Sequence, residues 1–76
     1  MKFVYQERMR KLREEHGKTQ REIAAILGTS QTMYARYERG ANEFPIRHLI
    51  KLCDFYKIST DYFLCRTDKP NGPYRK

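Results

Sequence analysis

The chain has 76 residues, of which 16 are lysine or arginine and nine are aspartate or glutamate, so its formal net charge is +7. This length predicts one domain with a small core, and the basic balance favours an anionic partner such as nucleic acid. No run approaches the ~18 apolar residues of a membrane span, and residues 1–12 mix acidic and basic side chains too early for a secretory signal. We therefore expect a cytoplasmic protein that does not enter a membrane.

The first predicted helix covers residues 4–15. Tyr5, Met9 and Leu12 recur there at helical spacing, and Gly17 can end the helix. Charged side chains fill most of the intervening positions, and we assign them to a solvated face.

A second helix is predicted over residues 20–28. Thr19 and Glu22 have the spacing of a capping box, in which each side chain accepts a hydrogen bond from the backbone N–H of the other residue. Gly28 follows the apolar stripe and can adopt the left-handed conformation that ends a helix. The stripe consists of Ile23, Ala24, Ile26 and Leu27.

A third helix is predicted over residues 31–38, because Thr29 or Ser30 can cap it directly after the glycine turn. On a helical wheel of about 100° per residue, Tyr34 and Tyr37 share one side, which we expect to face the core. Two short helices joined by such a turn are the arrangement that delivers a recognition helix into the DNA major groove.

The opposite side of residues 31–38 has no large apolar side chain and is the predicted base-reading surface. It carries Gln31, Thr32 and Arg36. Glutamine can bond adenine at two points, arginine can do the same to guanine, and threonine can offer its methyl group to thymine. These three residues therefore predict sequence-specific recognition of double-stranded DNA.

The fourth predicted helix begins at Pro45, which suits a first helical turn. Five apolar residues follow at helical spacing and predict a helix that lies mostly in the core. They are Ile46, Leu49, Ile50, Cys53 and Tyr56. The predicted solvent side carries Arg47, His48, Lys51 and Asp54.

A last short helix is predicted to run to Leu64, with Ser59 or Thr60 as its cap. These elements predict an all-α fold, a compact five-helix bundle with a helix-turn-helix. We assign residues 1–66 to this DNA-binding domain. Residues 67–76 contain two prolines and no apolar periodicity, which predicts a flexible tail.

Eight residues of the two central helices carry a resemblance to a known family. They are Gln20, Ile23, Ala24, Gly28, Ser30, Tyr34, Glu38 and Gly40. In type and spacing they resemble the helix-turn-helix domains of the phage repressor and Cro (XRE-like) family. The resemblance covers residues 4 to about 68, including the ending KISTDYFL, where Cys65 stands at a position that is usually glycine. It implies a lambda repressor-like fold and a transcriptional regulator, which we interpret as a repressor.

The resemblance also implies that Arg13 pairs with Glu38 and so ties the first helix to the end of the third. A bidentate arginine–carboxylate pair would fix the angle between these helices. Helix N-termini attract phosphate oxygens, and the loop after Gly40 is expected to lie beside the DNA. The predicted phosphate contacts are Gln20, Ser30, Arg39 and Asn42.

The predicted partner is double-stranded DNA carrying a palindromic operator, bound by a homodimer whose half-sites lie ~34 Å apart. Tyr62, Phe63 and the loop after the fourth helix are the expected dimer surface. One alternative is an antitoxin or interaction module whose domain mainly binds a protein partner. A third interpretation, suggested by the many aromatic residues, is RNA binding.

Other chemistry finds no support in the sequence. The two histidines and the two cysteines lack the short ligand spacing of a zinc site. There is no glycine-rich phosphate loop, no evident carboxylate pair and no serine nucleophile motif. We therefore expect no metal, no cofactor and no enzymatic activity, and we expect Cys53 and Cys65 to be reduced.

Overall fold

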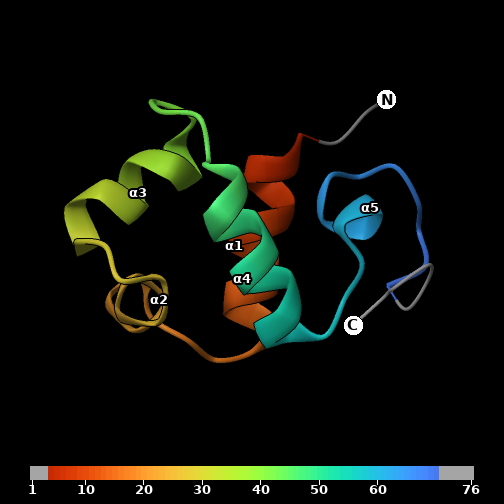
Figure 1. The fold of residues 1–76 in the computed structure, drawn as a ribbon, viewed down its shortest axis with the longest axis horizontal. Helices are drawn as coiled ribbons and strands as arrows, with labels where there is room; N and C mark the ends of the chain where they lie inside the picture. The colour runs from red at the N-terminus through yellow and green to blue at the C-terminus, as the bar shows by residue number, and fades with distance from the viewer. Residues whose placement is uncertain (1–3, 71–76) are drawn as a thin grey trace.

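The computed structural model describes residues 4–70, which form five helices and no strand. The helices are α1 (Tyr5–Glu15), α2 (Gln20–Leu27), α3 (Gln31–Arg39), α4 (Ile46–Tyr56) and α5 (Thr60–Phe63). In Figure 1, α1 and α4 lie at the centre, with α2 and α3 on one side and α5 on the other. The predicted all-α, five-helix fold is confirmed. None of these helices is long and apolar enough to cross a membrane.

The caps of α2 and α3 follow directly from the sequence. Thr19 and Glu22 form the predicted capping box, with hydrogen bonds of 2.9 and 3.1 Å between each backbone N–H and the other side chain. Gly28 ends α2 in the left-handed conformation, with φ of 74°. The Ser30 hydroxyl then accepts a hydrogen bond from the Met33 N–H at 3.0 Å and begins α3. These local signals fix the turn between the two helices.

The core lies where all five helices meet. Tyr34 and Tyr37 are buried, so α3 faces inward on the side that the helical wheel predicted. Phe44, in the loop after α3, stacks on Phe63 of α5 with ring centroids 5.9 Å apart. Aromatic contacts of this kind add about 0.5–1.5 kcal/mol beyond area burial. The buried apolar residues are Met9, Leu12, Ile23, Ala24, Leu27, Tyr34, Tyr37, Leu52, Cys53, Tyr56, Ile58 and Phe63.

Helix α4 is rotated relative to the prediction. Ile46 and Ile50 are 73% and 53% exposed, whereas His48 is only 6% exposed. The buried residues of α4 are His48, Leu52, Cys53 and Tyr56, and three of them, His48, Leu52 and Tyr56, lie four residues apart on one face. The prediction that Ile46 and Ile50 are core and that His48 faces solvent was therefore wrong. A pattern of apolar residues at helical spacing leaves histidine out, whereas His48 packs against aromatic rings.

His48 is expected to make the fold pH-sensitive. Burial, and then the charges of Arg47 and Lys51, lower the pKa of His48 below its usual 6.5. The folded state thus prefers the neutral ring. The stability that His48 contributes is therefore fully present above pH 6.5 and is lost as the pH falls through the lowered pKa. Stability should decrease by at most about 1.4 kcal/mol per pH unit in that range.

Thermal melts at pH 7.5 and 5.5 measure this effect. The melting temperature of the wild-type chain should fall at the lower pH, and the fall should be smaller in His48→Leu. The matched control is His16→Gln, because His16 is exposed. An equal fall in wild type and His48→Leu would contradict the role of His48.

Helix α5 begins at Ser59, whose hydroxyl accepts a hydrogen bond from the Tyr62 N–H at 3.0 Å. Phe63 is fully buried, so the prediction that it belongs to a dimer surface was wrong. Its short helix turns the ring toward the core. Residues 71–76, most of the predicted tail, lie outside the described residues. Within the described part, the Pro70 carbonyl accepts a hydrogen bond from the Ser59 N–H at 3.0 Å.

Cys65 adopts the backbone conformation that favours glycine. Its φ is +65°, and the next residue, Arg66, donates its N–H to the Asp61 carbonyl at 2.7 Å to close the end of α5. For an L-residue, this left-handed conformation costs roughly 1–2 kcal/mol. Glycine avoids that cost, but it loses more conformational entropy on folding, which offsets part of the gain. This explains why the related ending usually has glycine at the Cys65 position.

Replacing Cys65 by glycine should therefore stabilise the fold. We expect the free energy of unfolding to rise by about 0.5–1 kcal/mol in a urea titration. The control, Cys65→Ala, removes the thiol but keeps the left-handed strain, and it should bring no such gain. Equal stability of the glycine and alanine variants would show that the strain is negligible.

Candidate nucleic-acid interface

The outward side of α3 presents the three predicted base-reading side chains to solvent. Gln31, Thr32 and Arg36 are all exposed. Tyr34 and Tyr37 hold the opposite side of the same helix in the core. A helix anchored in this way can place polar side chains into a groove without exposing apolar surface.

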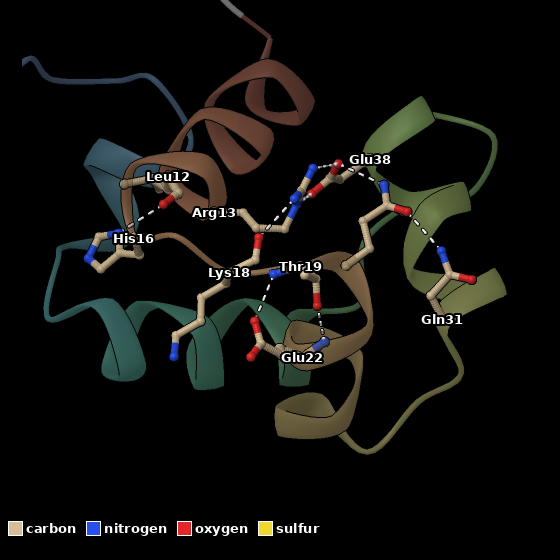
Figure 2. A network of polar contacts seen from close by, with 9 residues as sticks. Leu12, Arg13, His16, Lys18, Thr19, Glu22, Gln31 and Glu38 are labelled. Atoms are coloured by element: carbon tan, nitrogen blue, oxygen red, sulfur yellow. Dashed lines mark hydrogen bonds and ion pairs between the residues drawn. The ribbon is translucent and has the colours of Figure 1, made fainter.

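Arg13 and Glu38 are brought together as a bidentate ion pair. Arg13 Nε donates to Glu38 Oε2 at 2.7 Å, and Arg13 Nη2 donates to Glu38 Oε1 at 3.2 Å. A third donor, Nη1, reaches the Lys18 carbonyl at 2.9 Å. The side chains are only 13% and 4% exposed. The pair therefore joins α1 and the turn before α2 to the last turn of α3, as Figure 2 shows.

Glu38 remains ionised despite its burial. Burial alone would raise the pKa of Glu38, but the polar groups of Arg13, Tyr34 and Gln20 outweigh it, with Arg13 contributing most, so the pKa lies below the usual 4.5. The hydrogen bond to Glu38 raises the pKa of Arg13 in turn. The two charges therefore face each other in a direct bidentate contact that is largely shielded from water.

Gln20 connects this ion pair to the predicted base-reading surface. Its Nε2 donates to Glu38 Oε1 at 3.1 Å, and its Oε1 accepts a hydrogen bond from Gln31 Nε2 at 2.9 Å. Figure 2 shows the resulting chain from Arg13 through Glu38 to Gln31. Gln20 was predicted as a phosphate contact, and both ends of its amide are hydrogen-bonded to protein side chains in this structure.

A second contact holds Arg36. Its Nε donates to Oδ1 of Asn42, in the loop after α3, at 2.7 Å. Both side chains are exposed. The sequence placed these two residues in separate roles and gave no sign of the contact, because no periodicity relates a helix to an irregular loop.

The remaining predicted phosphate contacts are Ser30 and Arg39. The Ser30 hydroxyl is occupied by the α3 cap, and Arg39 is exposed at the end of that helix. Arg39 and Arg10 both line a shallow cleft of about 330 Å³ beside the ion pair. Arg10 belongs to the charged side chains that the sequence assigned to a solvated face. It lies one turn before Arg13 on α1, and that spacing is the signal that could have placed it here.

Within residues 4–70, no group of three or more histidine, cysteine, aspartate or glutamate side chains is arranged to hold a metal ion. Cys53 and Cys65 are both free thiols. Burial raises the pKa of Cys53 to about 12, so this thiol stays protonated and packs as a small apolar residue.

A model of the helix-turn-helix family matches residues 9–63. The chain belongs to this family. The match includes all eight residues on which the resemblance rests, and so confirms it. The described domain is a helix-turn-helix domain, in agreement with the prediction that the chain is not an enzyme.

Relatives of the helix-turn-helix domain carry the same designation. YobD of Bacillus subtilis, an uncharacterized HTH-type transcriptional regulator, is 34% identical over 68 residues, which cover 90% of this chain and 61% of YobD. ImmR of the same organism, an HTH-type transcriptional regulator, is 35% identical over 57 residues, covering 75% of this chain and 45% of ImmR. The chain thus spans about half the length of these curated relatives.

A solved structure shows the same fold. It is that of a transcriptional regulator from Listeria innocua, with a TM-score of 0.77 and 26% sequence identity. The similarity covers 84% of this chain and 60% of the Listeria protein. The helix-turn-helix and the helices that surround it are therefore the shared part of both proteins.

Proposed function

We propose that the chain is a sequence-specific DNA-binding transcriptional regulator that reads its operator with α3 in the major groove. The observation that carries this proposal is the asymmetry of α3, whose tyrosines are buried while Gln31, Thr32 and Arg36 are exposed. The designation of the relatives as transcriptional regulators supports it. The net charge of +7 favours approach to DNA.

Affinity and specificity come from different residues in this proposal. The N-terminus of α3 at Ser30 and the exposed Arg39 contact phosphates, where the helix dipole and the positive charge favour an anion. Gln31, Thr32 and Arg36 contact base edges. Phosphate contacts set the position of α3 on the duplex, and base contacts choose the sequence.

The operator is palindromic in this proposal, and the chain binds it as a homodimer. One domain of this size covers one half-site, and dimers of this class bind half-sites ~34 Å apart. Repression is the simplest outcome, because occupying an operator is enough to block transcription, whereas activation requires a further contact surface. Sedimentation of the free chain and of its DNA complex measures the stoichiometry.

A second candidate function is that of a protein-interaction module, such as an antitoxin. The exposed apolar side chains of Ile46 and Ile50 favour it, because they lie four residues apart on one face of α4 and neighbouring exposed apolar side chains mark protein-interaction sites.

Selection from a random double-stranded DNA library at about 150 mM salt separates the two candidates. Enrichment of a defined palindromic motif supports the regulator. Weak binding that salt abolishes, without any enriched motif, supports the interaction module. Competition with single-stranded RNA in the same assay tests the RNA-binding interpretation.

A further inference from the structure

The loop after α3 is anchored at both of its ends. Gly40 adopts the left-handed conformation with φ of 81°, and the Ala41 N–H donates to the Arg36 carbonyl at 2.9 Å. At the other end, the Phe44 N–H donates to the Tyr5 hydroxyl at 3.1 Å. The Phe44 ring also packs edge-on against Tyr37, with centroids 5.2 Å apart. The three residues between Gly40 and Phe44 therefore have a defined position next to Arg36.

Asn42 lies in the middle of this loop and contacts Arg36. The Asn42 Oδ1 accepts a hydrogen bond from Arg36 Nε at 2.7 Å. A guanidinium has only donors, so the amide oxygen, and not the amide nitrogen, must face it. This contact uses one of the five N–H groups of Arg36. The contact with Asn42 leaves the N–H groups on Nη1 and Nη2 unused. These are the groups that bond guanine O6 and N7 in an end-on bidentate contact.

We propose that Asn42 is a positioning residue that fixes the guanidinium of Arg36 for recognition of one guanine in each half-site. This rests on the proposed function. Asn42 then contributes to the choice of base rather than to general DNA affinity. It has a different role from the phosphate contact that its position in the sequence predicts. The anchored loop supplies the rigid support that an exposed arginine, with its many rotamers, lacks on its own.

The test compares dissociation constants of the full chain for three duplexes at about 150 mM salt. These are the selected operator, the operator with the Arg36-dependent guanine replaced, and a random sequence. Asn42→Ala should reduce discrimination between the first two duplexes about 3- to 10-fold, as expected for the loss of one solvent-exposed hydrogen bond worth about 0.7–1.4 kcal/mol. Its affinity for the random duplex should change less than about 2-fold, and it should have no effect in an Arg36→Ala background.

Two further variants sharpen the test. Asn42→Asp keeps the acceptor oxygen, so it should retain the discrimination while its negative charge weakens binding to all three duplexes. Glu43→Ala, at the exposed neighbouring position, is the matched control and should not reduce discrimination. Melting temperatures establish that all variants are folded.

The outcomes separate this proposal from the proposed function. If the wild-type chain selects a motif but Asn42→Ala loses affinity equally on all three duplexes, and additively with Arg36→Ala, Asn42 is a backbone contact and the positioning role is overturned. If the wild-type chain selects no motif, the proposed function fails and the positioning role fails with it.

Discussion

Replacing Arg13 by methionine should lower the free energy of unfolding by about 2–4 kcal/mol, because Glu38 would be left charged and nearly buried without its main partner. The estimate is slightly below the range for fully buried pairs, since the Arg13 side chain keeps 13% exposure. Urea unfolding followed by circular dichroism measures it. Arg10→Met, an exposed arginine one turn earlier on α1, is the matched control and should change stability by less than about 0.5 kcal/mol.

The origin of this loss can be tested with a double variant. Glu38→Gln removes the unpaired charge but keeps an acceptor for Gln20. Arg13→Met/Glu38→Gln should therefore be more stable than Arg13→Met alone, by about 1 kcal/mol or more. Losses that simply add, or an Arg13→Met variant as stable as wild type, would show that the ion pair does not hold α1 and α3 together.

Replacing Arg36 by alanine should weaken binding to the selected operator by about 1–3 kcal/mol and relax the preference at one base position. The reason is that, in the proposed function, the exposed guanidinium of Arg36 bonds one guanine at two points. Arg39→Ala should instead weaken binding to all sequences by a similar factor. It should also reduce the slope of log affinity against log salt by about one, because it removes a phosphate contact.

Repeating the library selection with each variant distinguishes these two roles. The Arg36→Ala chain should enrich a motif that is degenerate at one position of each half-site. The Arg39→Ala chain should enrich the wild-type motif. Equal losses for Arg36→Ala on operator and random duplexes would contradict its assignment to a base edge.

The parts of the fold that depend on local chemistry could be predicted from the sequence. The capping box at Thr19, the left-handed Gly28 and the Ser30 cap each act within a few residues, so the bounds of α2 and α3 follow from short-range rules. The two faces of α3 follow as well, because Tyr34 and Tyr37 are the only large rings on that short helix.

The rotation of α4 could not be predicted, because it depends on tertiary neighbours. His48 is buried among aromatic rings from two other segments, at 5.9 Å from Tyr37 and 5.8 Å from Phe44 between ring centroids. A hydropathy pattern assigns a histidine to the surface and isoleucines such as Ile46 to the core. In this fold, ring packing buries His48 and leaves Ile46 exposed, which is the reverse of what hydropathy predicts.

One contact of the candidate site was predicted from the sequence, but the others were not. The family resemblance indicated the Arg13–Glu38 pair across 25 positions of sequence. Nothing in the sequence indicated that Gln20 bridges Glu38 and Gln31, because a glutamine side chain can reach either a phosphate or a neighbouring amide. Which partner the Gln20 amide bonds depends on distances that are fixed only in the folded chain.

A backbone amide NMR titration of the 76-residue chain with its selected duplex tests the central claim most directly. We expect the largest shift changes at the N-terminus of α3, around Gln31 and Thr32, and in the loop near Asn42. Signals on the outer side of α4, such as that of Ile50, should change little. Shift changes centred on Ile46 and Ile50, with Gln31 and Thr32 unaffected, would contradict recognition by α3.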